Sequence, residues 1–401
     1  MAITNIYIKD LKVDNYKSLK KSQISLQKGL NFIIGKNGAG KSNLLEFIYI
    51  YASRNYFGLR NMPRPLNTNF SVTIEFLENE KKGLLKLIIE KIKNNDLFPD
   101  SSYLYEVTVN KSIGTKKTIN NQKFIVGGQG TKKFLAVREA YKNELQIFRA
   151  FRRTYIRFQF PENALWVSRP TKFTIDETND VTFEDSDYSF NLFAELEFSL
   201  EIDFFKDYDN KSKGNSVALK KKIIKHLSQT IEKRNINSIL KQYSPIQEIR
   251  INPNLNIYSN EQLTIVENLS IDFLLEGNWM PWSFLSDGTK RLFYILTEVI
   301  SSEGGLILLE EPELGIHPHQ LFKILQFLKD QSLEKQIIIS THSPSALDIL
   351  SDTELDRITI ARFEKGTKFN KLTKAQIDKA RKYIKDVGDF SSYWLHSDLE
   401  R

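Results

Sequence analysis

The segment GKNGAGKS at residues 35–42 constrains the fold of this chain more than any other part of the sequence. It matches the pattern G-x-x-x-x-G-K-[ST], whose glycines allow backbone N–H groups to curl around phosphate oxygens. The strand-like run NFII precedes it, and the helical run NLLEFIYI follows it. A bound anion would therefore lie at a helix N-terminus, where unpaired N–H groups and the helix dipole favour negative charge. The motif predicts an α/β fold with a site for nucleotide phosphates.

The residue types of this P-loop motif divide the work of binding a nucleoside triphosphate. Lys41 supplies a positive charge at the β- and γ-phosphates, and the Ser42 hydroxyl is placed to bind Mg²⁺. The predicted ATP-binding residues are Gly35, Lys36, Asn37, Gly38, Ala39, Gly40, Lys41, Ser42 and Asn43.

A second signal lies at residues 306–313, LILLEEPE. Its four consecutive apolar residues fit a strand that is buried on both faces of a sheet. At the end of this strand, Glu310 can hold Mg²⁺ through water, and Glu311 can orient and deprotonate an attacking water. An ordinary buried strand that ends in an exposed acidic turn would give the same pattern. The P-loop motif elsewhere in the chain favours the metal-binding and catalytic interpretation.

A third signal, QIIISTH at residues 336–342, is again a buried strand that ends in a polar residue. Between these two strands, apolar residues repeat at the spacing of an amphipathic helix. The unit is then β-α-β with parallel strands, and ligands of such sheets bind beyond the carboxyl ends of the strands. We therefore expect the P-loop, Glu310, Glu311 and His342 to converge on one nucleotide, with His342 as a γ-phosphate sensor. A structural role is the alternative for this histidine.

The fourth signal is LSDGTKR at residues 285–291, which precedes an apolar helical pattern. A serine at a helix start accepts a hydrogen bond from a free N–H group of the first turn. Simple capping by Ser286 would explain this segment. Its place shortly before the acidic strand suggests a second role for this segment.

Composition excludes several other kinds of site. The chain has no Cys, which removes disulfides, thiolate zinc sites, iron–sulfur clusters and Cys nucleophiles. No apolar run is long enough to cross a membrane, and the N-terminus lacks the apolar core of a signal peptide, so we expect a soluble cytoplasmic protein. The net charge of +8 suits either a nucleic-acid-binding face or lysines spread over a solvated surface.

The remaining chain alternates between strand-like and helical patterns. Strands are expected at residues 6–16, 22–34, 70–78, 103–110, 154–160, 263–277, 280–285 and 355–363, and a hairpin at 114–133. Helices are expected at residues 43–52, at residues 216–242 with a basic cluster at Lys220–Lys225, and after the capping-box pattern Thr373-x-x-Gln376.

In chain order, GKNGAGKS, LSDGTKR, LLEEPE and STHSP resemble the motifs of an ABC-type ATPase, with LSDGTKR in place of the signature LSGGQ. The segment GLNFIIGKNGAGKSNLLE is similar to RecF, SMC and OLD proteins. LSDGTKR, EPELGIHP and STHSPSALD are most similar to OLD-like ATPases, which include subunits of the antiphage systems Septu, PARIS and Gabija. The resemblance covers residues 5–55 and 260–350.

The resemblance implies an α/β P-loop NTPase fold with an ABC-type ATPase head, a mixed sheet flanked by helices, and an inserted helical and β lobe. It divides the chain into an ATPase core, residues 1–55 and 260–401, and a region of remaining N-lobe strands and inserted lobe, residues 56–259. It also implies Mg²⁺ as the cofactor that accompanies ATP.

The resemblance further assigns roles to single residues. Glu311 matches the catalytic glutamate, His342 the switch histidine, and Glu310 the aspartate associated with Mg²⁺. Gln159 is the candidate for the Q-loop glutamine near the metal, and Tyr16 either stacks on adenine or belongs to the strand core. The signature residues, which reach the ATP bound by a second subunit, are Ser286, Asp287 and Gly288.

Two departures from the family pattern suggest slow turnover. Glu310 stands in place of Asp, and Asp287 and Thr289 replace the Gly and Gln of LSGGQ. A third departure concerns length, because 59 residues follow His342 in the 401-residue sequence. A TOPRIM nuclease domain needs about 100 residues, so we expect no nuclease in this chain.

Three functional hypotheses follow. The first is an ATP-dependent sensor or scaffold that forms homodimers or higher homo-oligomers through composite ATP sites. It would work with a separate effector, with a nuclease as the first candidate, in antiphage defence. The second is a RecF-like DNA repair ATPase that clamps DNA. The third is a nucleotide-gated assembly protein with negligible turnover.

Overall fold

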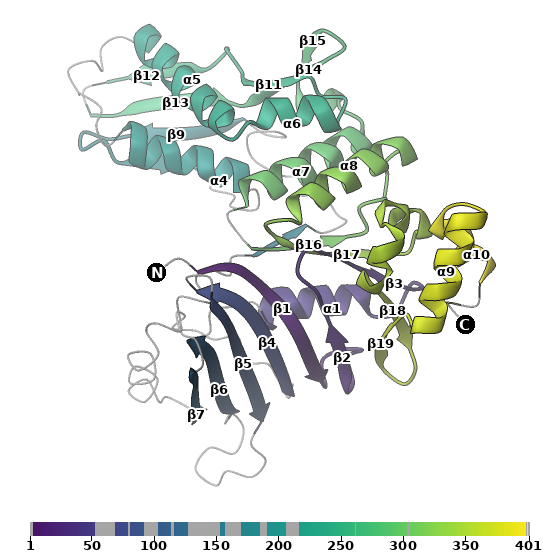
Figure 1. Ribbon diagram of the computed structural model, residues 1–401. Helices are drawn as coiled ribbons and strands as arrows, with labels where there is room; N and C mark the ends of the chain where they lie inside the picture. The colour runs from purple at the N-terminus through teal and green to yellow at the C-terminus, as the bar shows by residue number, and fades with distance from the viewer. Residues whose placement is uncertain are drawn as a thin grey trace. The chain divides into compact units, whose positions relative to one another are not determined.

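The computed structural model describes residues 3–52, 69–78, 81–91, 103–113, 116–126, 153–156, 170–184, 191–205, 216–260, 262–302, 305–397 and 399. The chain forms two compact units (Figure 1). Unit 1 comprises residues 1–158, 303–313 and 325–401, and unit 2 comprises residues 159–302 and 314–324.

Unit 1 contains a mostly parallel sheet in the order β19-β18-β3-β17-β16-β8. Each neighbouring pair is parallel except β18 and β19. All residues of β3, β16 and β17 are buried, which explains why their sequences are continuous apolar runs instead of alternating ones. The strands are β3 (Leu30–Ile34), β8 (Arg153–Ile156), β16 (Leu306–Glu310), β17 (Gln336–Thr341), β18 (Ile358–Phe363) and β19 (Thr367–Lys371).

A second, antiparallel sheet of unit 1 has the order β2-β1-β4-β5-β6-β7. Gln336 ties β1 to the parallel sheet, because its side-chain amide accepts from the Ile8 N–H and donates to the Ile8 carbonyl, both at 2.8 Å. The strands are β1 (Ile3–Asp14), β2 (Ser22–Ser25), β4 (Asn69–Glu78), β5 (Lys81–Lys91), β6 (Tyr103–Ile113) and β7 (Lys116–Val126).

Helix α1 (Lys41–Phe47) packs between the two sheets of unit 1 and continues as a π-helical turn, Ile48–Ala52. The Phe47 ring meets the Phe70 ring of β4 edge-on at 5.2 Å, and the same core cluster contains Leu308 of β16 and Ile338 of β17. The helix that follows the P-loop is therefore held from both sides by apolar contacts.

The C-terminal part of unit 1 contributes short helices beside the parallel sheet. The predicted capping box is confirmed, since Thr373 accepts from the Gln376 N–H and Gln376 accepts from the Thr373 N–H. The elements are the 3₁₀ segments η5 (Pro344–Ile349) and η6 (Asp352–Arg357) and the helices α9 (Lys374–Asp386) and α10 (Phe390–His396).

The described residues of unit 2 form two small sheets, β10-β9-β13-β12 and β11-β14-β15, together with helices α4 to α7 and the first part of α8. Its strands are β9 (Thr171–Ile175), β10 (Val181–Phe183), β11 (Glu248–Ile251), β12 (Asn256–Ser259), β13 (Thr264–Leu269), β14 (Ile271–Leu275) and β15 (Asn278–Met280). Its helices are α4 (Asn191–Phe198), continued by the π-helical turn Ser199–Phe204, α5 (Ser216–Lys233), α6 (Ile236–Tyr243) and α7 (Asp287–Ser301). Helix α8 (Pro318–Gln331) connects β16 to β17 and completes the predicted β-α-β unit.

Several predicted elements are divided in the structure. The run at residues 22–34 forms β2 and β3 in different sheets, with Gly29 between them in the left-handed region at φ +81°. The run at residues 263–277 likewise forms β13 and β14 in different sheets. The helix expected at residues 216–242 is interrupted at Asn235, which is also left-handed. The spacing of apolar residues does not reveal a single left-handed residue that turns the backbone.

One strand prediction was wrong, and another lies partly outside the described residues. Residues 282–284 of the run MPWSFL form a 3₁₀ helix, η4 (Trp282–Phe284), because Pro281 has no N–H to continue the β15 ladder. Within the hairpin expected at residues 114–133, the described residues 116–126 form one continuous strand, β7, which pairs with β6. Residues 127–133 lie outside the described part of the chain.

The two compact units also differ from the predicted division at residues 55 and 260. Strands β4 to β8 belong to unit 1 with the P-loop, since the antiparallel sheet covers α1. Helix α7, which begins at the predicted signature segment, belongs to unit 2. Among the described residues, no helix combines the length and the apolar character needed to cross a membrane.

Candidate functional site

The P-loop and the two predicted catalytic segments meet at one edge of the parallel sheet. Strand β17 lies between β3 and β16 and runs parallel to both. The last residue of β3, Ile34, is level with Thr341, and Glu310 is level with Ser340. The P-loop, His342 and Glu311 each follow directly from one of these strand ends. The three segments therefore begin at neighbouring strand ends, and their convergence on one nucleotide stays a prediction.

Glycines allow the P-loop to pass very close to neighbouring chain. A side chain at Gly35 would lie 2.3 Å from the Ala361 carbonyl oxygen of β18. Gly40 is left-handed at φ +91°, and a side chain there would lie 2.1 Å from the Thr367 hydroxyl and 2.5 Å from the Ser18 hydroxyl. Gly40 occupies the N-cap position of α1 and so places no side chain over the first N–H groups of the helix.

The side chains of the P-loop are ordered by the loop itself. Lys41 is only 5% exposed, and its ammonium group donates to the carbonyl oxygens of Gly35 at 2.6 Å and Lys36 at 3.2 Å. The Asn43 amide donates to the Ser18 hydroxyl at 2.8 Å. Ser42 is exposed at the start of α1. Asn37 and Gly38 are exposed, whereas Ala39 is buried.

The two carboxylates at the end of β16 have different surroundings. Glu310 is 4% exposed, and its Oε2 accepts from the Tyr155 hydroxyl of β8 at 3.1 Å. Glu311 has left the strand with φ +44°, a conformation that is rare for a residue with a long side chain. Such strain persists where the surrounding structure holds it and is frequent at functional sites. Here the Glu311 N–H donates to the Ser340 carbonyl at 2.8 Å.

His342 lies between two acidic side chains. Its Nδ1 is 3.6 Å from Oε1 of Glu311 and 3.4 Å from Oε1 of Glu313. The segment that follows is anchored by α10, where Asp348 of η5 accepts from the Ser391 N–H at 2.8 Å. Burial of Asp348 raises the pKa of its carboxyl group above the usual range. The chain is thus held on both sides of His342.

The residues at the site suit Mg²⁺. The Ser42 hydroxyl at the start of α1 and the Glu310 carboxylate at the end of β16 are hard oxygen donors, and Mg²⁺ prefers a few such ligands together with substrate phosphates. Gln159, the third candidate ligand, lies outside the described residues.

The predicted signature segment begins α7 in unit 2. The Ser286 hydroxyl accepts from the Thr289 N–H at 3.2 Å, so the capping role is confirmed. Gly288 lies against the loop after β16, since a side chain there would be 2.6 Å from the Gly315 carbonyl oxygen. The Asp287 side chain is fully exposed and 3.6 Å from the Lys290 ammonium.

Sequence reasoning missed Tyr155, Glu313 and the pair Ser18 and Thr367. Glu313 was visible in the acidic run LLEEPE but lies beyond the strand, so no role was given to it. Tyr155 lies in the expected strand at residues 154–160, which also contains Gln159, but no motif marks it. Ser18 and Thr367 carry no motif, because only folding brings them to Gly40. The Tyr16 ring packs edge-on against Phe47 at 5.1 Å, which is the core role considered for it.

Residues 30–348 match a family described as "AAA domain, putative AbiEii toxin, Type IV TA system". The chain belongs to this family. It is 22% identical over 369 residues to an ATP/GTP phosphatase from Helicobacter pylori, an alignment that covers 86% of the chain and 87% of that protein. It is also 22% identical over 227 residues to the DNA replication and repair protein RecF from Francisella tularensis, covering 56% of the chain and 59% of RecF.

Solved SMC head domains also resemble the chain, though weakly. One bound to the C-winged helix domain of ScpA is 16% identical with a TM-score of 0.43, covering 93% of the chain and 99% of that structure. The Pyrococcus furiosus Smc head is 15% identical with a TM-score of 0.46, covering 95% of the chain and 99% of that structure. The family match and the parallel sheet with the P-loop at its edge give the chain a P-loop NTPase fold.

Proposed function

We propose that the chain hydrolyses ATP slowly, with Mg²⁺, at composite sites between two copies, and that this activity controls a separate effector in antiphage defence. The observation that carries the proposal is the meeting of the P-loop, the Glu310–Glu311 pair and His342 at the ends of three adjacent parallel strands. This is the position at which such sheets bind ligands.

The residues of the site divide the reaction among them. The P-loop N–H groups and Lys41 bind the phosphates, and Glu311 accepts a proton from the attacking water. His342 contacts the γ-phosphate from the end of β17. Ser42 and Glu310 would hold Mg²⁺, which would neutralise phosphate charge when bound with ATP. Gln159 is proposed as a further ligand near the metal.

The second copy supplies the signature segment. We propose that Ser286, Asp287 and Gly288 approach the ATP that is bound to the partner's P-loop. The exposure of the α7 N-terminus supports this role, because Asp287 is fully solvent-accessible and open to a partner. ATP would then promote a head-to-tail homodimer with two composite sites.

The defence role is supported by the family, whose description names a toxin of a type IV TA system. The similarity to the ATP/GTP phosphatase of Helicobacter pylori supports the hydrolytic part of the proposal. We expect the chain to act in the cytoplasm and not to cut DNA by itself. Nuclease activity would appear only when a second protein is added.

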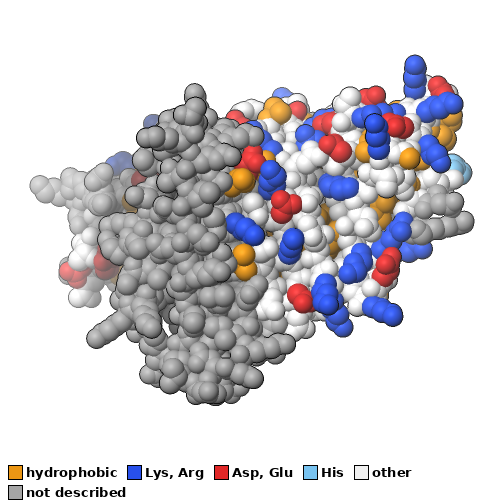
Figure 2. Space-filling view, turned by 60° about the horizontal axis from the view of Figure 1, so that its bottom comes forward, with side chains coloured by type: hydrophobic (Ala, Val, Ile, Leu, Met, Phe, Trp, Pro, Cys, Tyr) orange, Lys and Arg blue, Asp and Glu red, His pale blue; other side chains and the backbone are white. Residues whose placement is uncertain are grey.

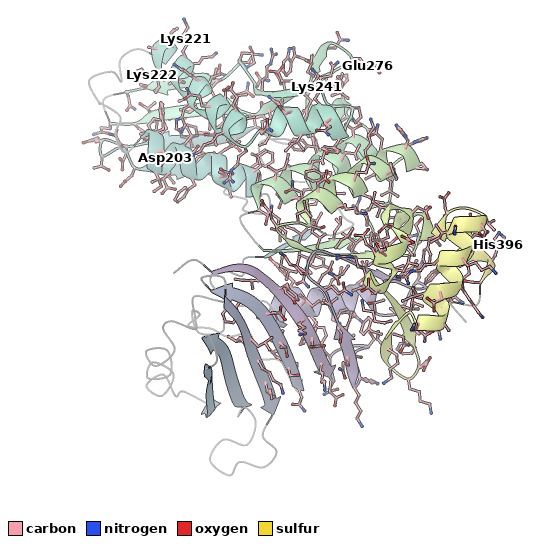
Figure 3. The ribbon with its side chains drawn as sticks, viewed as in Figure 1. Asp203, Lys221, Lys222, Lys241, Glu276 and His396 are labelled. Atoms are coloured by element: carbon pink, nitrogen blue, oxygen red, sulfur yellow. The ribbon has the colours of Figure 1, made fainter. Side chains whose placement is uncertain are left out.

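The similarity to RecF favours a second candidate function, a DNA repair ATPase. Helix α5 has one apolar face, with Leu219, Ile223, Leu227 and Ile231 buried, and an exposed basic face that includes Lys221 and Lys222 (Figure 3). Such a face suits the phosphate backbone of DNA or an acidic protein. On the described part of the face in Figure 2, Lys and Arg are interspersed with Asp and Glu, which fits spread charge on that face better than one large basic patch.

Two substitutions test the proposed ATPase. Glu311→Gln should retain ATP binding and trap the nucleotide, because the water loses its base. Ser286→Arg should block the ATP-dependent dimer and hydrolysis while leaving ATP binding to the monomer intact. ATP binding, dimer formation and hydrolysis of both variants are measured as ATP affinity, dimer mass and phosphate release, with and without DNA. Undiminished hydrolysis in Glu311→Gln would contradict the catalytic assignment, and stimulation by DNA alone would favour the RecF-like function.

A further inference from the structure

A third carboxylate, Glu313, stands beside His342. Its side chain is only 9% exposed, and all of its hydrogen bonds to described residues use one oxygen, Oε1. Oε1 accepts from the Thr341 hydroxyl at 2.6 Å and from the His342 backbone N–H at 3.1 Å. Glu313 therefore binds two consecutive residues at the point where the chain leaves β17.

The same contacts extend one residue further. The Thr341 hydroxyl, which donates to Glu313, accepts from the Ser343 N–H at 3.0 Å. The carboxylate thus determines the path of residues 341–343, with His342 in the middle. A loss of its charge would loosen this turn without opening the strand, since β17 is held by its own ladder to β3 and β16.

The surroundings of the imidazole ring distinguish its two nitrogens. Nδ1 faces Oε1 of Glu313 at 3.4 Å and Oε1 of Glu311 at 3.6 Å. These distances exceed those of strong hydrogen bonds, so the effect is mainly electrostatic. An Nδ1 lone pair would be repelled by both carboxylates, whereas an Nδ1–H group is attracted by both. The arrangement therefore favours a proton on Nδ1 and leaves Nε2 for other contacts.

We propose that Glu313 is a positioning residue that fixes the orientation of His342 and the proton on its Nδ1, so that Nε2 faces the nucleotide. This inference rests on the proposed hydrolytic role of His342. Glu313 itself touches no nucleotide in this scheme. It acts through His342, in the way that a buried carboxylate orients a histidine in other hydrolytic sites.

Glu313→Gln tests the charge with almost no change in size. The readout is the ¹⁵N spectrum of the imidazole groups in nucleotide-free protein, with the His342 signals identified by their loss in His342→Gln. The wild-type chain should show the Nδ1–H form of His342, and Glu313→Gln should shift the population toward Nε2–H. The kcat for ATP should fall about 10- to 100-fold, while KM stays within about twofold.

Glu334→Gln is the matched control, because Glu334 is exposed just before β17 and undergoes the same chemical change. It should match the wild type in both measurements. Glu313→Asp keeps the charge on a shorter side chain and should recover part of the Nδ1–H preference. Equal loss of that preference in the Gln and Asp variants would contradict the role of the charge.

The two measurements separate this inference from the proposed function. An unchanged His342 tautomer in Glu313→Gln would overturn the positioning role, whatever the rate of hydrolysis. A shifted tautomer with wild-type kcat would support the positioning role and would instead count against the participation of His342 in ATP hydrolysis.

Discussion

Helices α1 and α7 both begin at a proposed ATP contact, but their N-termini are built differently. The N-cap of α1 is Gly40, which is left-handed and offers no side-chain acceptor to the first turn. The N-cap of α7 is Ser286, whose hydroxyl accepts from the Thr289 N–H and also lies 2.9 Å from the Thr289 hydroxyl. The first turn of α1 therefore keeps its N–H groups available for a ligand. In α7, the Ser286 side chain already accepts a hydrogen bond from one N–H group of the first turn.

This difference indicates which of the two helix N-termini contributes more to ATP binding. An uncapped N-terminus gains most from a bound anion, because the phosphate takes the place of the missing cap. At α7, a phosphate would add to a cap that already exists. We therefore expect unit 1 to determine ATP affinity and the α7 segment to affect assembly and turnover.

The largest effect is expected for Lys41→Ala. Lys41 bridges the Gly35 and Lys36 carbonyls and carries the buried cation of the P-loop. Loss of a charged hydrogen bond of about 3 kcal/mol would weaken ATP binding about 100-fold or more. Titration calorimetry with ATP checks this, with exposed Lys28→Ala as the control that retains wild-type affinity. Near-normal ATP affinity in Lys41→Ala would contradict the expectation that the start of α1 determines ATP affinity.

A smaller effect separates two glycines of the same loop. Gly40→Ala would press on Ser18 and Thr367, whose hydroxyls lie 2.8 Å apart, and should cost about 3 kcal/mol of unfolding free energy along with ATP binding. Gly38 is also left-handed, at φ +79°, but a side chain there meets nothing within 4 Å, so Gly38→Ala should cost about 1 kcal/mol. Urea unfolding measures both, and equal losses would show that the close approach at Gly40 is unimportant.

The smallest stability effect is expected at the start of α7. Ser286→Ala removes the cap and should lower the unfolding free energy by about 1 kcal/mol, with ATP affinity unchanged and hydrolysis lost. Thr373→Ala removes the cap of α9 and should cost a similar amount without affecting hydrolysis. Unfolding curves and phosphate release distinguish the two. If Ser286→Ala still hydrolysed ATP as Thr373→Ala does, Ser286 would be a cap and nothing more.

Local chemistry made much of the fold predictable. The runs LILLE and QIIIST could be recognised as strands buried on both faces, because no alternation interrupts them. The P-loop and the caps at Ser286 and Thr373 are likewise short-range features, in which a few neighbouring residues determine the backbone. These were the parts of the site that sequence motifs could identify.

Other parts depended on residues far apart in the chain. The Gly40 contacts come from residues 18 and 367, and the Glu310 carboxylate is bound by Tyr155. Breaks such as those at Gly29 and Asn235 each depend on a single left-handed residue, which an average over a window conceals. The sequence indicated which strand ends would meet but not which of the neighbouring acidic residues would hold the histidine.

By itself, the sequence determined that a P-loop follows a buried strand, that two further buried strands end in Glu310–Glu311 and His342, and that a capped helix begins at Ser286. Only the tertiary structure decided that β17 lies between β3 and β16, that Glu311 turns into the left-handed region, and that Glu313 binds the end of β17. The physical reason is the distance along the chain over which each interaction acts. Apolar runs, glycines and caps act on the adjacent backbone, whereas carboxylate and hydroxyl contacts form only after burial of the strands has brought distant residues together.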